Sequence, residues 1–255
     1  MTNAHDAMPL SNSVLNNSEI IIENEFAALG LHPAIVKALD DLNYKKPTPV
    51  QAQAIPAFLA GRDLLVSSQT GSGKTAAFML PALQLISQKP RPEAVKPQRG
   101  VKGRRPRPAP ACPHLIVLTP TRELAQQVTS ATTQFDKYLR RTICASIVGG
   151  MPYPRQLEML AKMPDILVAT PGRLLDHMNS GRIDLSQLSM LVFDEADRML
   201  DMGFSEDIDA IVGQTPETRQ TLMFSATLDG RTGELAADML RDPVRVAIAQ
   251  AQMDY

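Results

Sequence analysis

The segment DLLVSSQTGSGKT, residues 63–75, decides the fold. Residues 63–67 predict a short apolar strand, and residues 76–86 predict a helix immediately after the glycines. A glycine-rich turn between a strand and a helix, closed by Lys74-Thr75, is typical of a phosphate-binding loop. A plain glycine turn would explain the glycines but not the Lys-Thr pair.

The loop suggests a role for each of its residue types. Its glycines let backbone amides turn toward phosphate oxygens, Lys74 supplies a positive charge, and Thr75 offers a hydroxyl to Mg²⁺. The usual pattern begins with Gly, where this chain has Ser68. The candidate phosphate contacts are Ser68, Gln69, Thr70, Gly71, Ser72, Gly73, Lys74 and Thr75.

Further strand-like runs recur along the chain, and amphipathic helical segments separate most of them. These runs are 115–118, 143–148, 166–169, 190–193, 221–224 and 244–248, and helical patterns at 33–42 and 49–60 precede the first strand. Uniformly apolar strands that alternate with helices predict an α/β fold, with a mostly parallel central sheet covered by helices on both faces. In this class, ligands bind at the carboxyl ends of the strands.

Composition bounds the class of protein. The 255 residues are 44% apolar and 21% charged, which supports a globular core, and the net charge of -1 gives no overall basic signature of nucleic-acid binding. Cys112 and Cys144 lack metal-ligand spacing, and no signal peptide or membrane-spanning run is visible. We therefore expect a cytoplasmic monomer without a membrane partner, in which any nucleic-acid binding is local.

Two segments depart from the α/β pattern. Residues 1–24, rich in Asn and Ser, predict a flexible tail ahead of a domain at 25–255 that starts near Phe26. Residues 89–113, dense in Pro and Arg, predict an exposed basic insertion. The insertion is either a solvated loop or a polyanion-binding arm, and the sequence leaves both open.

Three carboxylates follow the strand at 190–193, in the stretch Asp194-Glu195-Ala196-Asp197. Phosphoryl transfer needs a metal, a carboxylate to hold it and a group that orients water. Asp194, together with Thr75, fits the role of metal ligand, and Glu195 fits the role of the base that orients water. We expect both carboxylates to be exposed at the rim of the core. The alternative is an acid-rich helix start favoured by the macrodipole, and only the upstream phosphate loop favours catalysis.

The letters DEAD at 194–197 are one of several motifs that occur here in a fixed order. The others are PTPVQ at 47–51, SQTGSGKT at 68–75, PTREL at 120–124, GG at 149–150, TPGR at 170–173 and SAT at 225–227. From about Phe26 onward the chain thus resembles the DEAD-box ATP-dependent RNA helicases, in a bacterial style. The resemblance implies a first RecA-like domain that uses ATP and Mg²⁺, with Lys74, Asp194 and Glu195 as catalytic residues.

The same resemblance points to an adenine site. Gln51 can pair with two edge atoms of adenine, and Tyr44 is available to stack. The family usually has Gly-Phe where this chain has Asn43-Tyr44, and Phe26 resembles the family's upstream aromatic near this site. Without the other motifs, Gln51 would be read as an ordinary exposed helix residue.

Several helix starts resemble the family's RNA contacts. Thr-Pro and Pro-Thr pairs are good helix starts, and a helix N-terminus beside an Arg is also an anion site. The resemblance assigns sequence-independent RNA backbone contacts to Pro120, Thr121, Arg122, Gly149, Gly150, Thr170, Pro171, Gly172 and Arg173. It assigns coupling of ATP to strand separation to Asp197, Ser225 and Thr227, and we expect the serine-threonine motif to contact Asp197.

The family's complete core has a second RecA-like domain, whose motifs do not occur before Tyr255. Its arginine fingers are worth on the order of 10³ to 10⁵ in rate, so we expect this chain to bind adenine nucleotide but hydrolyse it poorly. Two alternatives are a P-loop ATPase acting on DNA or protein and an ATP-gated RNA clamp. The DEAD sequence and Gln51 argue against the first, whereas the second stays open.

Overall fold

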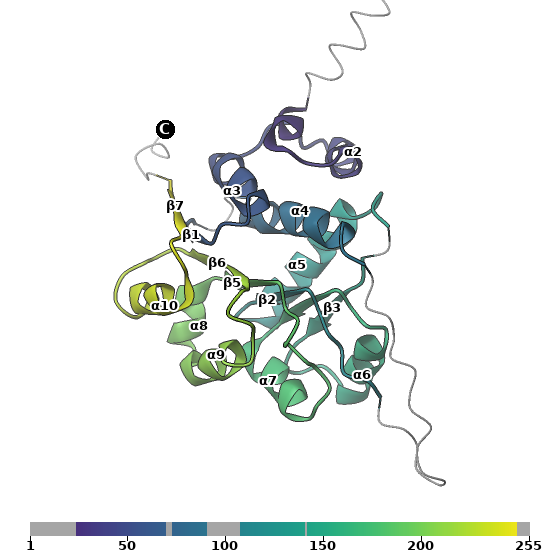
Figure 1. The fold of residues 1–255 in the computed structure, drawn as a ribbon, viewed down its shortest axis with the longest axis vertical. Coiled ribbons are helices and arrows are strands. Elements are labelled where there is room, and N and C mark those ends of the chain that lie inside the picture. The colour runs from purple at the N-terminus through teal and green to yellow at the C-terminus, as the bar shows by residue number, and fades with distance from the viewer. Residues whose placement is uncertain (1–23, 70–72, 91–107, 141, 249–255) are drawn as a thin grey trace, which may run out of the picture.

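One seven-stranded sheet organises the molecule. The computed structural model describes residues 24–69, 73–90, 108–140 and 142–248. The strand order is β3-β4-β2-β5-β6-β1-β7, and every described pair is parallel, as the sequence predicted (Figure 1). The strands are β1 (Leu64–Ser67), β2 (Leu115–Leu118), β3 (Cys144–Ile147), β4 (Ile166–Ala169), β5 (Met190–Asp194), β6 (Gln220–Ser225) and β7 (Val244–Ala247).

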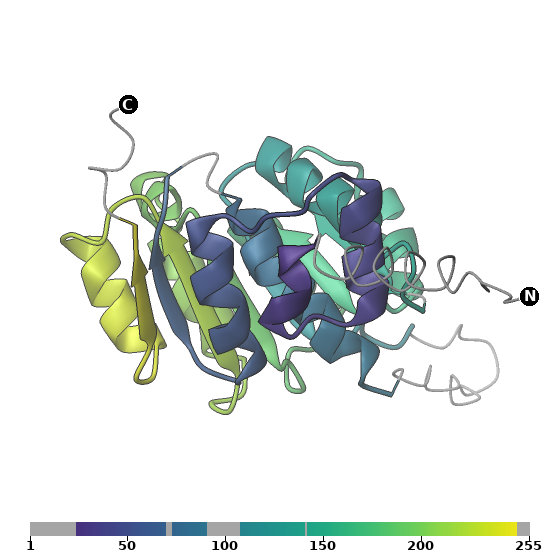
Figure 2. The ribbon, with the colours of Figure 1, turned by 90° about the horizontal axis from the view of Figure 1, so that it is seen from above.

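Helices cover both faces of the sheet, because alternate strand residues point to opposite sides. In β1, Leu64 and Val66 pack under one helical layer and Leu65 under the other. Figures 1 and 2 show the two layers of helices on opposite faces of the sheet. The first layer contains η1 (Glu25–Leu29), α2 (Pro33–Asp41), α3 (Pro49–Leu59), α4 (Lys74–Ser87) and α5 (Arg122–Phe135). The second contains α6 (Tyr153–Ala161), α7 (Pro171–Asn179), α8 (Ala196–Asp201), α9 (Ser205–Val212) and α10 (Arg231–Met239).

Buried aspartates tie both edge strands to the sheet. Asp63, directly before β1, accepts hydrogen bonds from Thr221 N at 2.9 Å and from Arg241 N at 2.8 Å, near the start of β7. Asp165, directly before β4, accepts one from Ile143 N at 3.0 Å, next to β3. Each carboxylate therefore satisfies backbone donors where an outer strand begins.

Asn24 belongs to the folded N-terminal part, although the sequence placed it in the tail. Asn24, assigned to the tail, is buried; its Oδ1 accepts from Phe26 N, and its Nδ2 donates to Asp40 and to the carbonyl of Tyr44. A short polar side chain at this position accepts a hydrogen bond from a free backbone N–H at the helix start. The polarity of Asn24 therefore reflects helix capping rather than disorder. Residues 1–23 lie outside the described part.

The end of the predicted basic insertion is part of the fold, which corrects the sequence prediction. Ala111 is buried and pairs with Ile183, its N–H donating to Arg182 O at 2.9 Å. Pro113 is buried as well. A small apolar residue such as Ala111 fits the core beneath the second helical layer. Proline can be buried where the sheet does not need a backbone N–H donor. Residues 91–107 lie outside the described part.

No helix in the described ranges is long and apolar enough to cross a membrane.

Replacement of Asp63 by Ala should destabilise the domain by about 2 to 4 kcal/mol, because two buried N–H groups lose their acceptor. Chemical denaturation measures the change, and Asp238→Ala, an exposed position of α10, is the control and should be near neutral. Equal stability of the two variants would contradict the role given to Asp63.

Asp136, at the C-terminal end of α5, should make stability depend on pH. Burial raises the pKa of its carboxyl from 3.8 to about 6. The folded state therefore binds this proton more tightly than the unfolded state, and its stabilising effect is complete below about pH 4 and lost as the pH rises through 6. Asp136→Asn should stabilise the domain by about 1 kcal/mol at pH 7.5, allowing for solvent screening.

Urea denaturation of both proteins from pH 4 to pH 8 tests this. The difference in free energy of unfolding should shrink toward pH 4, and a difference independent of pH would contradict the assignment.

Candidate functional site

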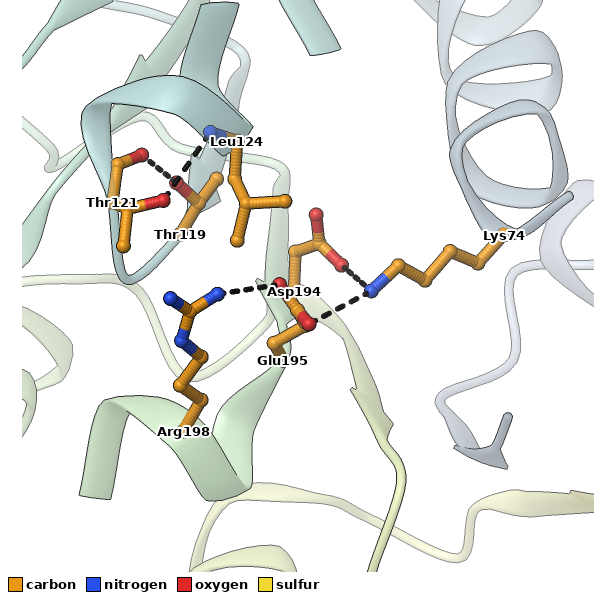
Figure 3. A network of polar contacts seen from close by, with 7 residues as sticks. All are labelled: Lys74, Thr119, Thr121, Leu124, Asp194, Glu195 and Arg198. Atoms are coloured by element: carbon orange, nitrogen blue, oxygen red, sulfur yellow. Dashed lines mark hydrogen bonds and ion pairs between the residues drawn. The ribbon is translucent and has the colours of Figure 1, made fainter. Parts of the chain in front are cut away.

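The phosphate loop and the acidic strand end meet at the carboxyl edge of the sheet. Only β6 lies between β1, which leads into the loop, and β5, which ends at Asp194. Lys74 Nζ, in the first turn of α4, lies 3.0 Å from Asp194 Oδ1 and 3.8 Å from Glu195 Oε1 (Figure 3). Residues more than a hundred positions apart therefore form one cluster of charge.

Asp194 is buried rather than exposed at the rim, which corrects the sequence prediction. It is the last residue of β5, and its side chain is 1% exposed. Burial raises the pKa of this carboxyl, and the ammonium of Lys74 opposes the rise. The strand continues one residue further than its apolar run, and Lys74 neutralises the buried charge.

Glu195 has a geometry that a simple helix start does not explain. Its backbone is left-handed, with φ +58°, at the N-cap of α8, and its side chain makes no capping hydrogen bond. The carboxylate instead lies toward Lys74, with Arg198 Nη1 4.0 Å from its other oxygen (Figure 3). The helix-start interpretation therefore accounts for Asp197, in the first turn, but not for Glu195.

Two buried oxygens at this edge have no hydrogen-bond partner among the described residues. They are Ser68 Oγ, directly after β1, and Glu195 Oε2, directly after β5. Buried polar atoms without partners are uncommon in proteins. Their occurrence at this edge marks it as a candidate site for a polar ligand.

The described part of the phosphate loop leads into α4. Gly73, at the N-cap, has φ +81°, a conformation that favours glycine, and Lys74 and Thr75 follow in the first turn. Ser68 N donates to Ser225 O at 3.0 Å, and Gln69 is exposed. Thr70, Gly71 and Ser72 lie outside the described residues.

Gln51 is buried and joins the start of α3 to this loop. Its Oε1 accepts from Thr48 N at 2.9 Å in a reciprocal capping box, and its Nε2 donates to Gly73 O at 3.0 Å. The reading of Gln51 as an exposed helix residue is therefore wrong. An amide carries two donors and two lone pairs, so one of each remains for an adenine edge.

Tyr44 lies seven positions before Gln51 and is 50% exposed, as a stacking residue requires. Asn43 before it adopts φ +60°, a conformation that Asn tolerates better than most residues, so it replaces the family's usual glycine without breaking the turn. Glu25 N donates to Lys45 O at 2.8 Å, and this bond fixes the loop. Phe26 is buried in the core beneath the first helical layer.

The expected contact between the SAT motif and Asp197 is present. Thr227 Oγ1 donates to Asp197 Oδ2 at 3.3 Å, and Ser225 Oγ donates to Thr227 O at 2.6 Å. With the bond from Ser68 N to Ser225 O, a continuous chain of contacts runs from the phosphate loop to α8.

The PTREL, GG and TPGR segments form one continuous surface. Thr121 caps α5 by accepting from Leu124 N (Figure 3), and Thr170 is the N-cap of α7. Gly149 N donates to Thr170 Oγ1 at 3.2 Å, and a methyl group on Gly150 would lie 3.8 Å from Arg122 Nη1. The three segments are thus neighbours, although at least 20 positions separate them in sequence.

Not every residue of these segments presents its side chain. Pro120 and Pro171 are buried, and Gly172 packs near Asp207 of α9. Arg173 is half-buried, and its Nη1 donates to Met151 O at 3.1 Å and to Gln156 Oε1 at 3.2 Å. These residues shape the surface from within.

Sequence reasoning missed Gln156 and His177, which are both fully buried behind this surface. His177 Nε2 lies 2.7 Å from Gln156 Oε1, and its ring stacks on Tyr153 with centroids 4.6 Å apart. Burial and the neighbouring Arg173 lower the pKa of His177. A polar pair on the inward face of two amphipathic helices was the only signal that could have revealed them.

Comparison with known proteins agrees with this geometry. The family model described as DEAD/DEAH box helicase matches residues 48–235. The chain belongs to the DEAD/DEAH box helicase family.

Individual relatives of this helicase domain extend the comparison. The chain is 47% identical over 226 residues to "ATP-dependent RNA helicase DeaD" of Escherichia coli K12, covering 89% of this chain and 33% of that protein. It is 40% identical to the protein of that name from Mycobacterium tuberculosis, covering 87% of this chain and 36% of the relative. The chain therefore spans about a third of the length of these curated relatives.

A solved structure shares the fold. The crystal structure of a hypothetical ATP-dependent RNA helicase from Sulfolobus tokodaii superimposes with a TM-score of 0.72 at 35% identity. The match covers 86% of this chain and 57% of that one.

A methyl group at Gly73 should disrupt the junction between Gln51 and the loop. It would lie 2.4 Å from Gln51 Nε2, in a backbone conformation that disfavours a side chain. Gly61→Ala is a matched control, because Gly61 has φ +82° and nothing within 4 Å of its added methyl.

Both variants should lose about 1 kcal/mol to backbone strain, and Gly73→Ala about 1 to 3 kcal/mol more. Thermal unfolding measures both losses. Equal losses would show that the contact with Gln51 adds nothing.

Proposed function

We propose that this chain is the ATP- and RNA-binding first domain of an RNA helicase, which couples Mg-ATP hydrolysis to local RNA duplex unwinding or remodelling of RNA–protein complexes. The observation that carries the proposal is the convergence of Lys74 with Asp194 and Glu195 at the end of β5, beside a phosphate loop.

Each residue at this edge has a part in the proposed chemistry. Lys74 binds the outer phosphates, Glu195 orients the attacking water, and Gln51 with Tyr44 holds adenine. Asp194 and the hydroxyl of Thr75 suit Mg²⁺, a hard cation that prefers oxygen ligands, partly through water. The buried oxygens beside them that have no hydrogen-bond partner among the described residues, Ser68 Oγ and Glu195 Oε2, support this fit. When bound, the ion neutralises charge on the phosphates.

RNA binding is proposed on the surface made by PTREL, GG and TPGR. The N-termini of α5 and α7, with Arg122, offer partial and full positive charge, and glycines allow close approach of a backbone. Such groups recognise phosphate and 2′-hydroxyl rather than base edges, so binding should be sequence-independent. The net charge of -1 gives no overall attraction to RNA, so the attraction is proposed to be local.

Coupling between the two sites is proposed to pass through Ser225, Thr227 and Asp197. Their hydrogen bonds connect the start of the phosphate loop to α8. A change at the phosphates therefore has a physical path to Asp197 and α8.

Full activity is proposed to need a second RecA-like domain that closes over the ATP. Residues 1–255 alone then bind ATP but hydrolyse it slowly, because arginine fingers from a second domain contribute on the order of 10³ to 10⁵ in rate. Free Cys112 and Cys144 suit a cytoplasmic monomer. An ATP-gated RNA clamp is the second candidate, since the same contacts would hold RNA without strand separation.

Glu195→Gln tests the catalytic assignment in the protein that includes the second domain. It should lower RNA-stimulated ATP hydrolysis by about 100-fold or more while leaving ATP and RNA affinity intact. Glu206→Gln, an exposed position of α9, is the matched control. Unchanged hydrolysis in Glu195→Gln would remove this residue as the base, and strand separation by the wild type, followed in the same assay, would exclude a pure clamp.

A further inference from the structure

A buried amide behind the proposed RNA surface holds both ends of the diglycine loop. Gln156 Nε2 donates to Val148 O, directly before Gly149, at 2.7 Å. Gln156 Oε1 accepts from Arg173 Nη1 at 3.2 Å, and the same Nη1 donates to Met151 O, directly after Gly150, at 3.1 Å. One side chain of α6, with its partner in α7, therefore brackets the loop.

The chemistry of the partners fixes the orientation of this amide. Val148 O can only accept a hydrogen bond, so the NH₂ group of Gln156 faces it. The guanidinium of Arg173 can only donate, so Gln156 Oε1 faces Arg173. His177 Nε2, 2.7 Å from the same oxygen, must then be the donor, and His177 carries its proton on Nε2. All four groups are compatible with a single arrangement.

No other common side chain of this length reproduces that arrangement. Glu keeps the acceptor but loses the donor toward Val148 O, Met loses both, and Asn is one carbon shorter. Gln156 is fully buried, so water cannot substitute for the lost partners. The position therefore requires a hydrogen-bond donor and a hydrogen-bond acceptor on the same side-chain amide.

We propose that Gln156 is a positioning residue for RNA binding, and that Arg173 acts with it from within rather than as a direct phosphate contact. Together they fix the position of Gly149 and Gly150 on the surface that also contains Thr170 and Arg122. The inference rests on the proposed RNA-binding function, because it assigns a role to that same surface. His177 supports the amide through its hydrogen bond to Gln156 Oε1.

The test compares Gln156→Met and His177→Leu with wild-type 1–255, using Gln214→Met, an exposed residue after α9, as the matched control. Hydrogen exchange at residues 148–152 should rise in Gln156→Met and less so in His177→Leu, while exchange at α4 stays unchanged. Binding of a single-stranded RNA should weaken about 10-fold in Gln156→Met, as expected for one lost hydrogen bond. Binding of a fluorescent ADP analogue should not change, which a general loss of structure could not produce.

The outcomes separate this inference from the proposed function. Wild-type exchange and RNA affinity in Gln156→Met would overturn the positioning role. A wild-type chain that binds no RNA would overturn the RNA-binding proposal instead, and exchange at 148–152 would still decide whether Gln156 holds the loop. If Gln156→Met does not fold, an unchanged loop and RNA affinity in His177→Leu would count against the network.

Discussion

The ion pair between Lys74 and Asp194 is the contact on which the candidate site depends. It spans 3.0 Å between the first turn of α4 and the last residue of β5. The parallel sheet makes it possible, because the carboxyl ends of β1, β6 and β5 lie side by side at one edge. A buried carboxylate is costly unless a partner neutralises it, so each group requires the other. The pair therefore marks the edge at which we propose that phosphate and Mg²⁺ bind.

The surroundings of this pair extend its influence to both proposed ligands. Gln51 joins the adenine side to Gly73, and the contacts of Ser225 and Thr227 run from the phosphate loop to Asp197. On the other side, a hydrogen bond joins Gly149 to Thr170, and Arg122 lies next to Gly150. One sheet thus positions both the candidate nucleotide edge and the proposed RNA surface.

Sequence periodicity predicted the strands and most of the helices, since uniformly apolar runs between helical patterns leave few other folds. It could not predict the burial of Asp194, because a strand's last residue depends on the lysine that arrives from elsewhere. The packed end of the basic insertion at Ala111 was missed because Pro and Arg dominated its composition. Gln156 was missed because its partners lie across α6 and α7, and no local pattern marks a long-range amide bond.

Calorimetric titration of Mg-ATP into the chain tests the central claim most directly. One ATP should bind per chain, and Lys74→Met should weaken that binding at least about 10-fold, since a charge-assisted contact to phosphate is lost. Lys162→Met, at an exposed position after α6, should bind as the wild type does. Undiminished ATP binding by a folded Lys74→Met variant would contradict the assignment of this edge as the nucleotide site.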